Sequence, residues 1–277
     1  MLDLPDQNSA RLKGPLARLN RNLSGYFGET IDIDAVLQDC LMTAERAGWQ
    51  VEMLDASPQP QLVTLRRAFP GNGTKPLKTI YLSAGIHGDE PAGPLAVHQL
   101  LREYRWPAGL EVWICPCLNP TGFALNRREN SQGTDLNRQF LQPKAEEVLA
   151  HIAWLKRQPF FDLALCLHED WEANGFYVYE LNPDQLPSLA ERMVTAVEPV
   201  CPIDRSEIIE GRPAAGGIIR PSTDPRTRPD WPEAFYLLNH KTRLTYTLEA
   251  PSDFPLPVRV AALVTGTASS IEQLLAT

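Results

Sequence analysis

The stretch LKTIYLSAGIHGDEPAGPLAVHQLLREY, residues 77–104, contains a strand pattern, a turn and a helix pattern in succession. Residues 77–82 are apolar and β-branched, as in a buried strand, and residues 94–104 have apolar side chains at helical spacing. Between these segments, His87 and Glu90 stand three residues apart among small residues. The pattern predicts a buried strand that ends in a glycine-lined turn carrying two polar side chains.

The rest of the chain repeats this alternation of strand and helix patterns. We expect further strands at 61–69, 110–120, 161–170, 175–181 and 242–251, helices at 32–48, 144–157, 186–200 and 258–276, a turn at 70–75, and loops at 121–142 and 204–235. Such alternation predicts an α/β fold with a mixed, mostly parallel, twisted sheet and helices on both faces. No linker interrupts it, so we expect a single domain over residues 1–277.

Residues 1–60 precede this pattern and are predicted to form a helical extension packed on the domain. The extension could cover the sheet, narrow a cleft or make a contact between two copies of the chain. The sequence does not choose among these three roles, and it leaves the oligomeric state open.

The composition excludes several classes of partner. With 26 Lys and Arg against 34 Asp and Glu, the net charge of −8 argues against nucleic-acid binding. No apolar run approaches the ~18 residues of a membrane span, and the first residues lack a signal-peptide pattern. The five scattered cysteines fit reduced, buried positions. We therefore expect a cytoplasmic protein without a nucleic-acid or membrane partner.

Polar side chains stand where several predicted strands end, which is where open α/β sheets bind ligands. His87 and Glu90 follow one strand, and His168 stands near the end of another. Two imidazoles and a carboxylate could bind one zinc ion and leave a fourth position open for water. Cobalt or manganese could occupy the same three ligands.

A hydrolytic metal site also needs a carboxylate that takes and returns a proton. Glu249, at the end of the last predicted strand, is our candidate because no neighbour in sequence needs it for a cap or an ion pair. Glu169, Asp170 and Glu172 are alternatives because they directly follow His168.

The loop NPTGFALNRRENSQGTDLNRQF, residues 119–140, is dense in arginine and asparagine. Guanidinium and amide groups suit an anionic substrate and a developing oxyanion. A salt-bridged surface loop is the alternative interpretation.

Five motifs in a fixed order give a more specific indication. HGDE (87–90), NPTG (119–122), GTDLNR (133–138), LHED (167–170) and TLEAP (247–251) together resemble the zinc metallocarboxypeptidase family. Within these carboxypeptidase A-like enzymes, the intact GTDLNR and TLEAP are similar to the small bacterial murein-peptide amidases. The resemblance implies an eight-stranded mixed sheet and one Zn²⁺ per chain, bound by His87, Glu90 and His168.

The resemblance also implies roles for the other site residues. Glu249 matches the general base, and Arg128 matches the arginine that polarises the scissile carbonyl. Asn137 and Arg138 match the pair that holds the terminal carboxylate of the substrate. Asp135 matches the carboxylate that orients the first zinc histidine and strengthens it as a ligand.

Two further assignments stay open at this stage. Arg127 takes the place of Arg128 if the loop register shifts by one residue. Tyr236 is the candidate for the family's mobile tyrosine over the substrate, but its surroundings, WPEAFYLL, also fit a helix packed on the core.

The predicted loop at 204–235 lies between the third ligand and the general base, and it contains Arg220, Arg226 and Arg228. An arginine in this position would select an acidic side chain in the substrate. A solvated basic loop is the competing interpretation.

We therefore expect a zinc-dependent hydrolase that cleaves a C-terminal amide or peptide bond in a peptide-like substrate with a free carboxylate. One alternative is an N-acyl-amino-acid amidohydrolase of the succinylglutamate desuccinylase and aspartoacylase type. A non-catalytic relative that only binds carboxylates is the other, although such a protein would not need Glu249.

Overall fold

A ten-stranded sheet organises the computed structural model, which describes residues 16–54, 61–71 and 77–277. Its strands are β1 Gln50–Leu54, β2 Leu62–Phe69, β3 Lys78–Ala84, β4 Leu110–Cys115, β5 Leu163–Asp170, β6 Tyr177–Leu181, β7 Ile208–Ile209, β8 Arg212–Ala215, β9 Ile218–Ile219 and β10 Thr245–Pro251. Their spatial order is β1-β2-β4-β3-β5-β10-β6-β9-β8-β7. The central strands β4, β3, β5 and β10 run parallel, whereas β2 and β6 pair antiparallel to β4 and β10.

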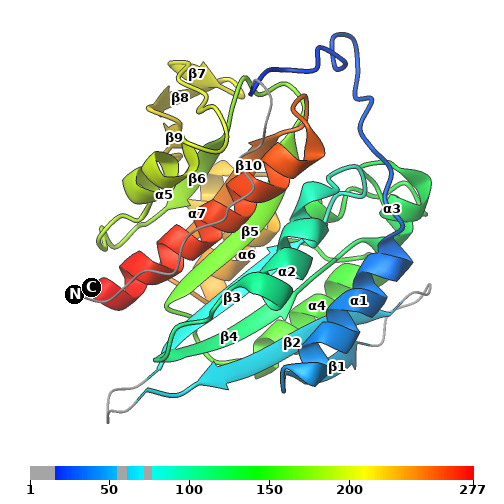
Figure 1. The fold of residues 1–277 in the computed structure, drawn as a ribbon, viewed down its shortest axis with the longest axis vertical. Helices are drawn as coiled ribbons and strands as arrows, with labels where there is room; N and C mark the ends of the chain where they lie inside the picture. The colour runs from blue at the N-terminus through cyan, green and yellow to red at the C-terminus, as the bar shows by residue number, and fades with distance from the viewer. Residues whose placement is uncertain (1–15, 55–60, 72–76) are drawn as a thin grey trace.

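Helices cover both faces of this sheet (Figure 1). They are α1 Ile33–Arg46, α2 Ala92–Glu103, α3 Pro120–Leu125, α4 Glu146–Arg157, α5 Ala190–Val197, α6 Glu233–His240 and α7 Leu256–Ala276, with two short 3-10 turns, η1 Leu136–Arg138 and η2 Pro225–Thr227. Helices α1, α2, α5 and α7 share one apolar core with alternate strand residues such as Leu165 and Leu248. Helices α4 and α6 pack on the other face around Tyr81 and Cys166.

The predicted fold class is confirmed, with more strands than the sequence indicated. Residues 50–54 form β1, which pairs antiparallel with β2, so the predicted helical extension also contributes a strand to the sheet. The predicted loop at 204–235 contains β7, β8, β9 and the start of α6. Strands of two to four residues are too short for a periodic pattern. They are strands because β9 pairs with β6, β8 with β9 and β7 with β8.

The predicted irregular segment at 121–142 also contains regular structure. Asn119 caps the short helix α3 by accepting a hydrogen bond from the Gly122 N–H at 2.9 Å. Asn126 ends α3 in the left-handed conformation, with φ of 46°. Most of the predicted turn at 70–75 lies outside the described residues, as do residues 1–15 and 55–60 of the predicted extension.

No helix among the described residues is both long enough and apolar enough to cross a membrane.

Candidate metal centre and substrate pocket

The turn between β3 and α2 presents His87 and Glu90 beside the loop that follows β4. Gly88 permits this contact, because a Cβ atom there would lie only 2.1 Å from the carbonyl carbon of Gly122. The Gly88 N–H also donates to the carbonyl oxygen of Arg128 at 3.4 Å. Gly88, between His87 and Glu90 in sequence, therefore allows two loops of the site to come into contact.

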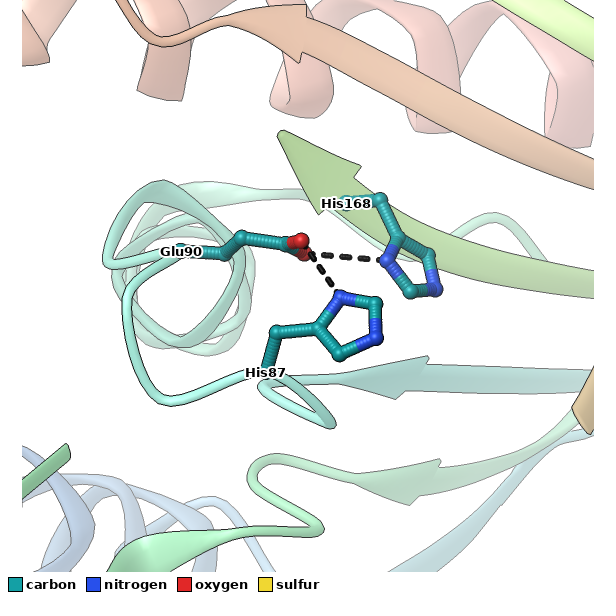
Figure 2. Close-up of side chains that lie close together, drawn as sticks. All are labelled: His87, Glu90 and His168. Carbon is teal, nitrogen blue, oxygen red and sulfur yellow. Dashed lines mark hydrogen bonds and ion pairs between the residues drawn. The ribbon is translucent and has the colours of Figure 1, made fainter. Parts of the chain in front are cut away.

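His87, Glu90 and His168 converge at one point, as Figure 2 shows. Glu90 Oε1 lies 2.5 Å from His87 Nδ1, and Glu90 Oε2 lies 2.9 Å from His168 Nδ1. Candidate ligand atoms of all three residues lie within 4.8 Å of one another, and all three residues are buried. Although burial opposes it, the two neighbouring imidazoles hold the pKa of Glu90 below its ordinary value.

This donor set fits a metal ion. Both imidazoles turn their Nδ1 atoms toward the shared carboxylate, as ligands of one ion would. The other ring nitrogen of His87, Nε2, lies 3.5 Å from Asp135 Oδ1. A carboxylate in that position favours the tautomer with its proton on Nε2 and leaves the Nδ1 lone pair for a metal.

Arg128, in the loop after α3, lies next to this cluster. Its Nε donates to Asp135 Oδ2 at 2.9 Å, and its Nη1 lies 3.8 Å from Glu90 Oε1. Arg127, the alternative to Arg128, points elsewhere: its Nη2 donates to the carbonyl oxygen of Asn130 at 2.5 Å, and it does not line the pocket. The structure thus brings Arg128, and not Arg127, to the cluster.

Glu249 enters the same pocket from β10, where it is the register partner of His168 on β5. Its enclosed position, and then the nearby Glu90 and Glu210, raise the pKa of Glu249 well above its ordinary value. Its side chain makes no hydrogen bond or ion pair with another described residue. An unengaged carboxylate beside the cluster suits proton transfer.

The alternative carboxylates after His168 differ from Glu249 in their surroundings. Glu169 accepts the Ala92 N–H at 2.5 Å and pairs with Arg259. Asp170 accepts the Tyr177 hydroxyl at 3.1 Å, and it also accepts a backbone N–H from the exposed Glu172. Glu169 and Asp170 therefore already have hydrogen-bond or ion-pair partners, and Glu172 is exposed.

The pocket around the cluster has a volume of about 270 Å³ and is also lined by Asn137 and Arg138 of η1. The Oδ1 atom of Asn137 accepts the Glu233 N–H at 2.8 Å, which leaves its NH₂ group as the donor for a ligand. The Glu233 carboxylate is buried beneath the pocket and accepts hydrogen bonds from Tyr81 and Ser83, each at 2.8 Å.

Three arginines line one end of the pocket: Arg138, Arg212 of β8 and Arg228. Within the described parts of the chain, none of them forms an ion pair with a carboxylate. Burial, followed by the charges of Arg212 and Arg138, lowers the pKa of Arg228, so the three guanidinium groups lie close enough to repel one another. The Arg228 guanidinium lies 4.1 Å from the centre of the Phe235 ring.

Three residues that the sequence placed at the substrate lie outside this pocket. Arg220 pairs with Glu180 at 2.5 Å and with Glu191 at 2.6 Å, because β6 and α5 bring these carboxylates beside it. Arg226 is exposed and pairs with Asp224 at 2.8 Å. These ion pairs favour the competing interpretation of a solvated basic loop for Arg220 and Arg226.

Tyr236 is corrected, because it lies on the buried side of α6. It is 6% exposed, and its ring centroid lies 5.8 Å from that of Phe140 and 4.6 Å from that of His240. Its packing matches the core helix that the sequence allowed as the alternative.

The sequence did not single out Tyr26, Tyr179, Glu210 or Arg212, which all line the pocket. For Tyr179 a signal existed, since it alternates with Tyr177 along β6, the strand that pairs with β10. Arg212 and Glu210 belong to the short β7–β8 hairpin, and Tyr26 belongs to an irregular segment, so neither location had a periodic signal.

The fold is similar to that of metallo-carboxypeptidases, and the buried cluster could hold a metal ion. The sequence comparison agrees: residues 76–196 match the family model for the succinylglutamate desuccinylase/aspartoacylase catalytic domain. This match covers less than half of the chain. A comparison with proteins of curated function finds no significant match.

Solved structures share this fold. A protein from Shewanella amazonensis, provisionally described as a metallopeptidase, is 25% identical, with a TM-score of 0.75 over 90% of this chain and 98% of that one. A metallo-carboxypeptidase from Burkholderia cenocepacia is 17% identical, with a TM-score of 0.66 over 89% and 70% of the two chains. A metallo-carboxypeptidase from Pseudomonas aeruginosa, in complex with (2-guanidinoethylmercapto)succinic acid, is 20% identical, with a TM-score of 0.61 over 88% and 68%.

Proposed function

We propose that the protein is a zinc-dependent hydrolase that cleaves the C-terminal amide or peptide bond of a small peptide-like substrate with a free carboxylate. The observation that carries this proposal is the arrangement of one pocket. Its centre holds His87, Glu90 and His168, Glu249 lies beside them, and an arginine cluster lies at one end. A single zinc ion per chain suits this set of three ligands.

Each residue near the cluster has a role in this reaction. Bound zinc would supply a water of lowered pKa, about 7, and a Lewis acid for the scissile carbonyl. Glu249 takes the proton from the attacking water and returns it to the leaving nitrogen. Arg128 donates to the oxygen on which negative charge develops, and Asp135 holds both Arg128 and His87 in place.

The carboxylate end of the substrate binds at η1. Asn137 supports this role because its amide oxygen is already bonded to Glu233, so its NH₂ group faces the ligand as a donor. Arg138 supplies the charge, since its guanidinium has no carboxylate partner among the described residues.

We further propose a preference for an acidic C-terminal residue. This preference was expected from an arginine among Arg220, Arg226 and Arg228. It is supported by Arg228 and by Arg212, which line the pocket next to Arg138. Three like charges gathered at one end repel one another, and a substrate with two carboxylates would relieve that repulsion.

An N-acyl-amino-acid amidohydrolase is the second candidate function. The family match over residues 76–196 favours it, and it would use the same zinc ligands, base and arginine cluster. A non-catalytic carboxylate binder has less support, because it would need neither Glu249 nor Arg128 at the cluster. The five cysteines are free and buried, which supports action in a reducing compartment such as the cytoplasm.

The test is hydrolysis by the purified, zinc-loaded protein, with metal content measured by elemental analysis. Ala-Glu and Gly-Phe dipeptides represent the peptidase, and N-acetylglutamate and N-succinylglutamate represent the amidohydrolase. We expect about one zinc per chain and hydrolysis that a chelator abolishes and added zinc restores. If protein of full zinc content hydrolysed none of these four substrates, the proposal would be overturned.

A further inference from the structure

We propose that residues 16–31 close one end of the pocket, the end that would hold the acyl part of the substrate, on the N-terminal side of the cleaved bond. The enzyme would then accept substrates whose acyl part is no longer than about one residue. The inference rests on the proposed hydrolase function and adds a limit on substrate size. In Figure 1 this segment is the dark blue trace at the top of the view, which begins near the start of α7 and then descends to α1.

One end of the segment is bound to the loop after β10. The carboxylate of Asp253, which is fully buried, accepts the backbone N–H groups of Asn20 at 3.1 Å and Arg21 at 2.8 Å. It also accepts Arg18 Nε at 3.2 Å, and the Leu19 N–H donates to the backbone oxygen of Asp253 at 2.7 Å. Four hydrogen bonds to one residue hold the segment against the strand that carries Glu249.

The other end is bound through a buried arginine. Arg259 of α7 forms ion pairs with Glu29 of the segment and with Glu169, 2.5 Å away, the residue after His168. Arg259 is fully buried, and a buried charge without its partners would be costly. The segment is therefore held at both ends by contacts that continue to the site.

Tyr26 lies between these two attachments and lines the pocket. Its hydroxyl is enclosed and has no hydrogen-bond partner among the described residues. Glu29, three residues after Tyr26, pairs with Arg259, which also pairs with Glu169. Glu169 accepts the N–H of Ala92, the first residue of α2. Tyr26 thus stands on the α2 side of the cluster.

The arginine cluster defines the opposite end. Arg228 lies 4.1 Å from the Phe235 ring of α6, and Asn137, next to Arg138, is bonded to Glu233 of α6. Helix α6 packs on the opposite face of the sheet from α2 and α7. If the substrate carboxylate binds at Arg138 and its amide lies at the cluster, its acyl part extends toward Tyr26. The acyl part therefore meets the segment, which is fixed by Asp253 and Arg259, and not open solvent.

The size of the pocket agrees with a short substrate. Its volume of about 270 Å³ is close to the lower end of the range of about 300–1,000 Å³ that is common for ligand clefts. A dipeptide or an N-acyl amino acid is the substrate class that fits. Of the three roles left open for the N-terminal extension, residues 16–31 would narrow the cleft.

The experiment is a substrate length series with one C-terminal residue: N-acetylglutamate, Ala-Glu, Ala-Ala-Glu and Ala-Ala-Ala-Glu. For the wild-type protein we expect kcat/KM to fall about tenfold or more between Ala-Glu and the tetrapeptide. In Tyr26→Ala, the ratio of tetrapeptide to dipeptide kcat/KM should rise by about the same factor. Tyr26→Phe should behave as the wild type, because the aromatic ring, and not the hydroxyl, blocks the acyl part of longer substrates.

The matched control is Phe27→Ala. Phe27 is the next residue and is 60% exposed, but it does not line the pocket, so this variant should keep the wild-type length dependence. Equal kcat/KM along the wild-type series would overturn the inference alone, whatever the folding of the variants. No hydrolysis of any member by zinc-loaded protein would overturn the proposed function, and the size limit with it.

Discussion

Glu249 and His168 are partners in the register of two adjacent parallel strands, β10 and β5. Side chains in register on neighbouring strands point to the same face of the sheet, so the candidate base and a candidate zinc ligand stand side by side. Both strands lie in the centre of the sheet, and β5 is buried along its whole length. Their separation is thus set by the backbone hydrogen bonds between the two strands.

This register makes Glu249→Gln a sharp test of the base. Glutamine has nearly the same shape but cannot accept the proton, so kcat should fall by about 10²–10⁴. Zinc content should stay at the wild-type value, because Glu249 is not among the converging ligand atoms. The measurement pairs dipeptide hydrolysis with elemental analysis.

The control for this variant is Glu172→Gln, which removes an exposed carboxylate from the wall of the same pocket. Its kcat should match that of the wild type. If Glu249→Gln turned over substrate at the wild-type rate, another group would have to be the base.

Replacement of a candidate zinc ligand should lower the metal content of the protein while the protein still folds. His168→Ala should reduce zinc from about one ion per chain to near zero and abolish hydrolysis. His98→Ala is the matched control, since this histidine lies on α2 away from the cluster and should leave zinc unchanged. Full zinc content in both His168→Ala and His87→Ala would show that the metal binds elsewhere.

The arginine cluster predicts a change in substrate preference. Arg212→Ala and Arg228→Ala should each lower kcat/KM for Ala-Glu about tenfold while changing that for Ala-Phe much less. Arg226→Ala removes an exposed arginine that is paired with Asp224, so it should change neither value. Equal losses for the two substrates would assign the arginines to general binding of the terminal carboxylate.

Glu233 predicts a specific pH dependence of stability. Burial raises its pKa from 4.5 to about 7, and the hydrogen bonds from Ser83 and Tyr81 only partly oppose this. Between these values the folded protein holds a proton that the unfolded chain has released. The stability that protonated Glu233 gives the folded protein is therefore fully present below pH 4.5, and it is lost as the pH rises to about 7.

Thermal unfolding from about pH 5 to pH 8 measures this loss. Glu233→Gln cannot titrate, so its midpoint should fall less than that of the wild type over this interval. Glu172→Gln, which changes an exposed carboxylate, should follow the wild-type curve. Parallel curves for the wild type and Glu233→Gln would mean that Glu233 is already ionised in the folded protein.

The fold class and the central strands could be predicted because their signals are local. The apolar run before His87 and the helical spacing after Glu90 occupy contiguous residues, and β3 and α2 form there. The same holds for β5 and β10, which end beside His168 and Glu249. Hydrophobic periodicity reports which face of an element is buried, so contiguous residues carry the information.

The arginine end of the pocket had no such signal. Residues 204–235 contain five arginines that are chemically equivalent in sequence: Arg205, Arg212, Arg220, Arg226 and Arg228. Arg205 pairs with Glu198. Arg220 is neutralised by Glu180 and Glu191, which come from β6 and α5, and Arg226 by Asp224. Arg212 and Arg228 remain for the pocket because no carboxylate of another described element reaches them.

The sequence by itself thus determined the α/β architecture and the set of chemical groups at the strand ends. Only the tertiary structure decided which arginines face the substrate, that Tyr236 belongs to the core, and that Tyr26 lies at the pocket. The physical reason is the range of the interactions. Strand and helix patterns depend on neighbours along the chain, whereas charge pairing and the attachment of residues 16–31 to Asp253 depend on segments that meet only after folding.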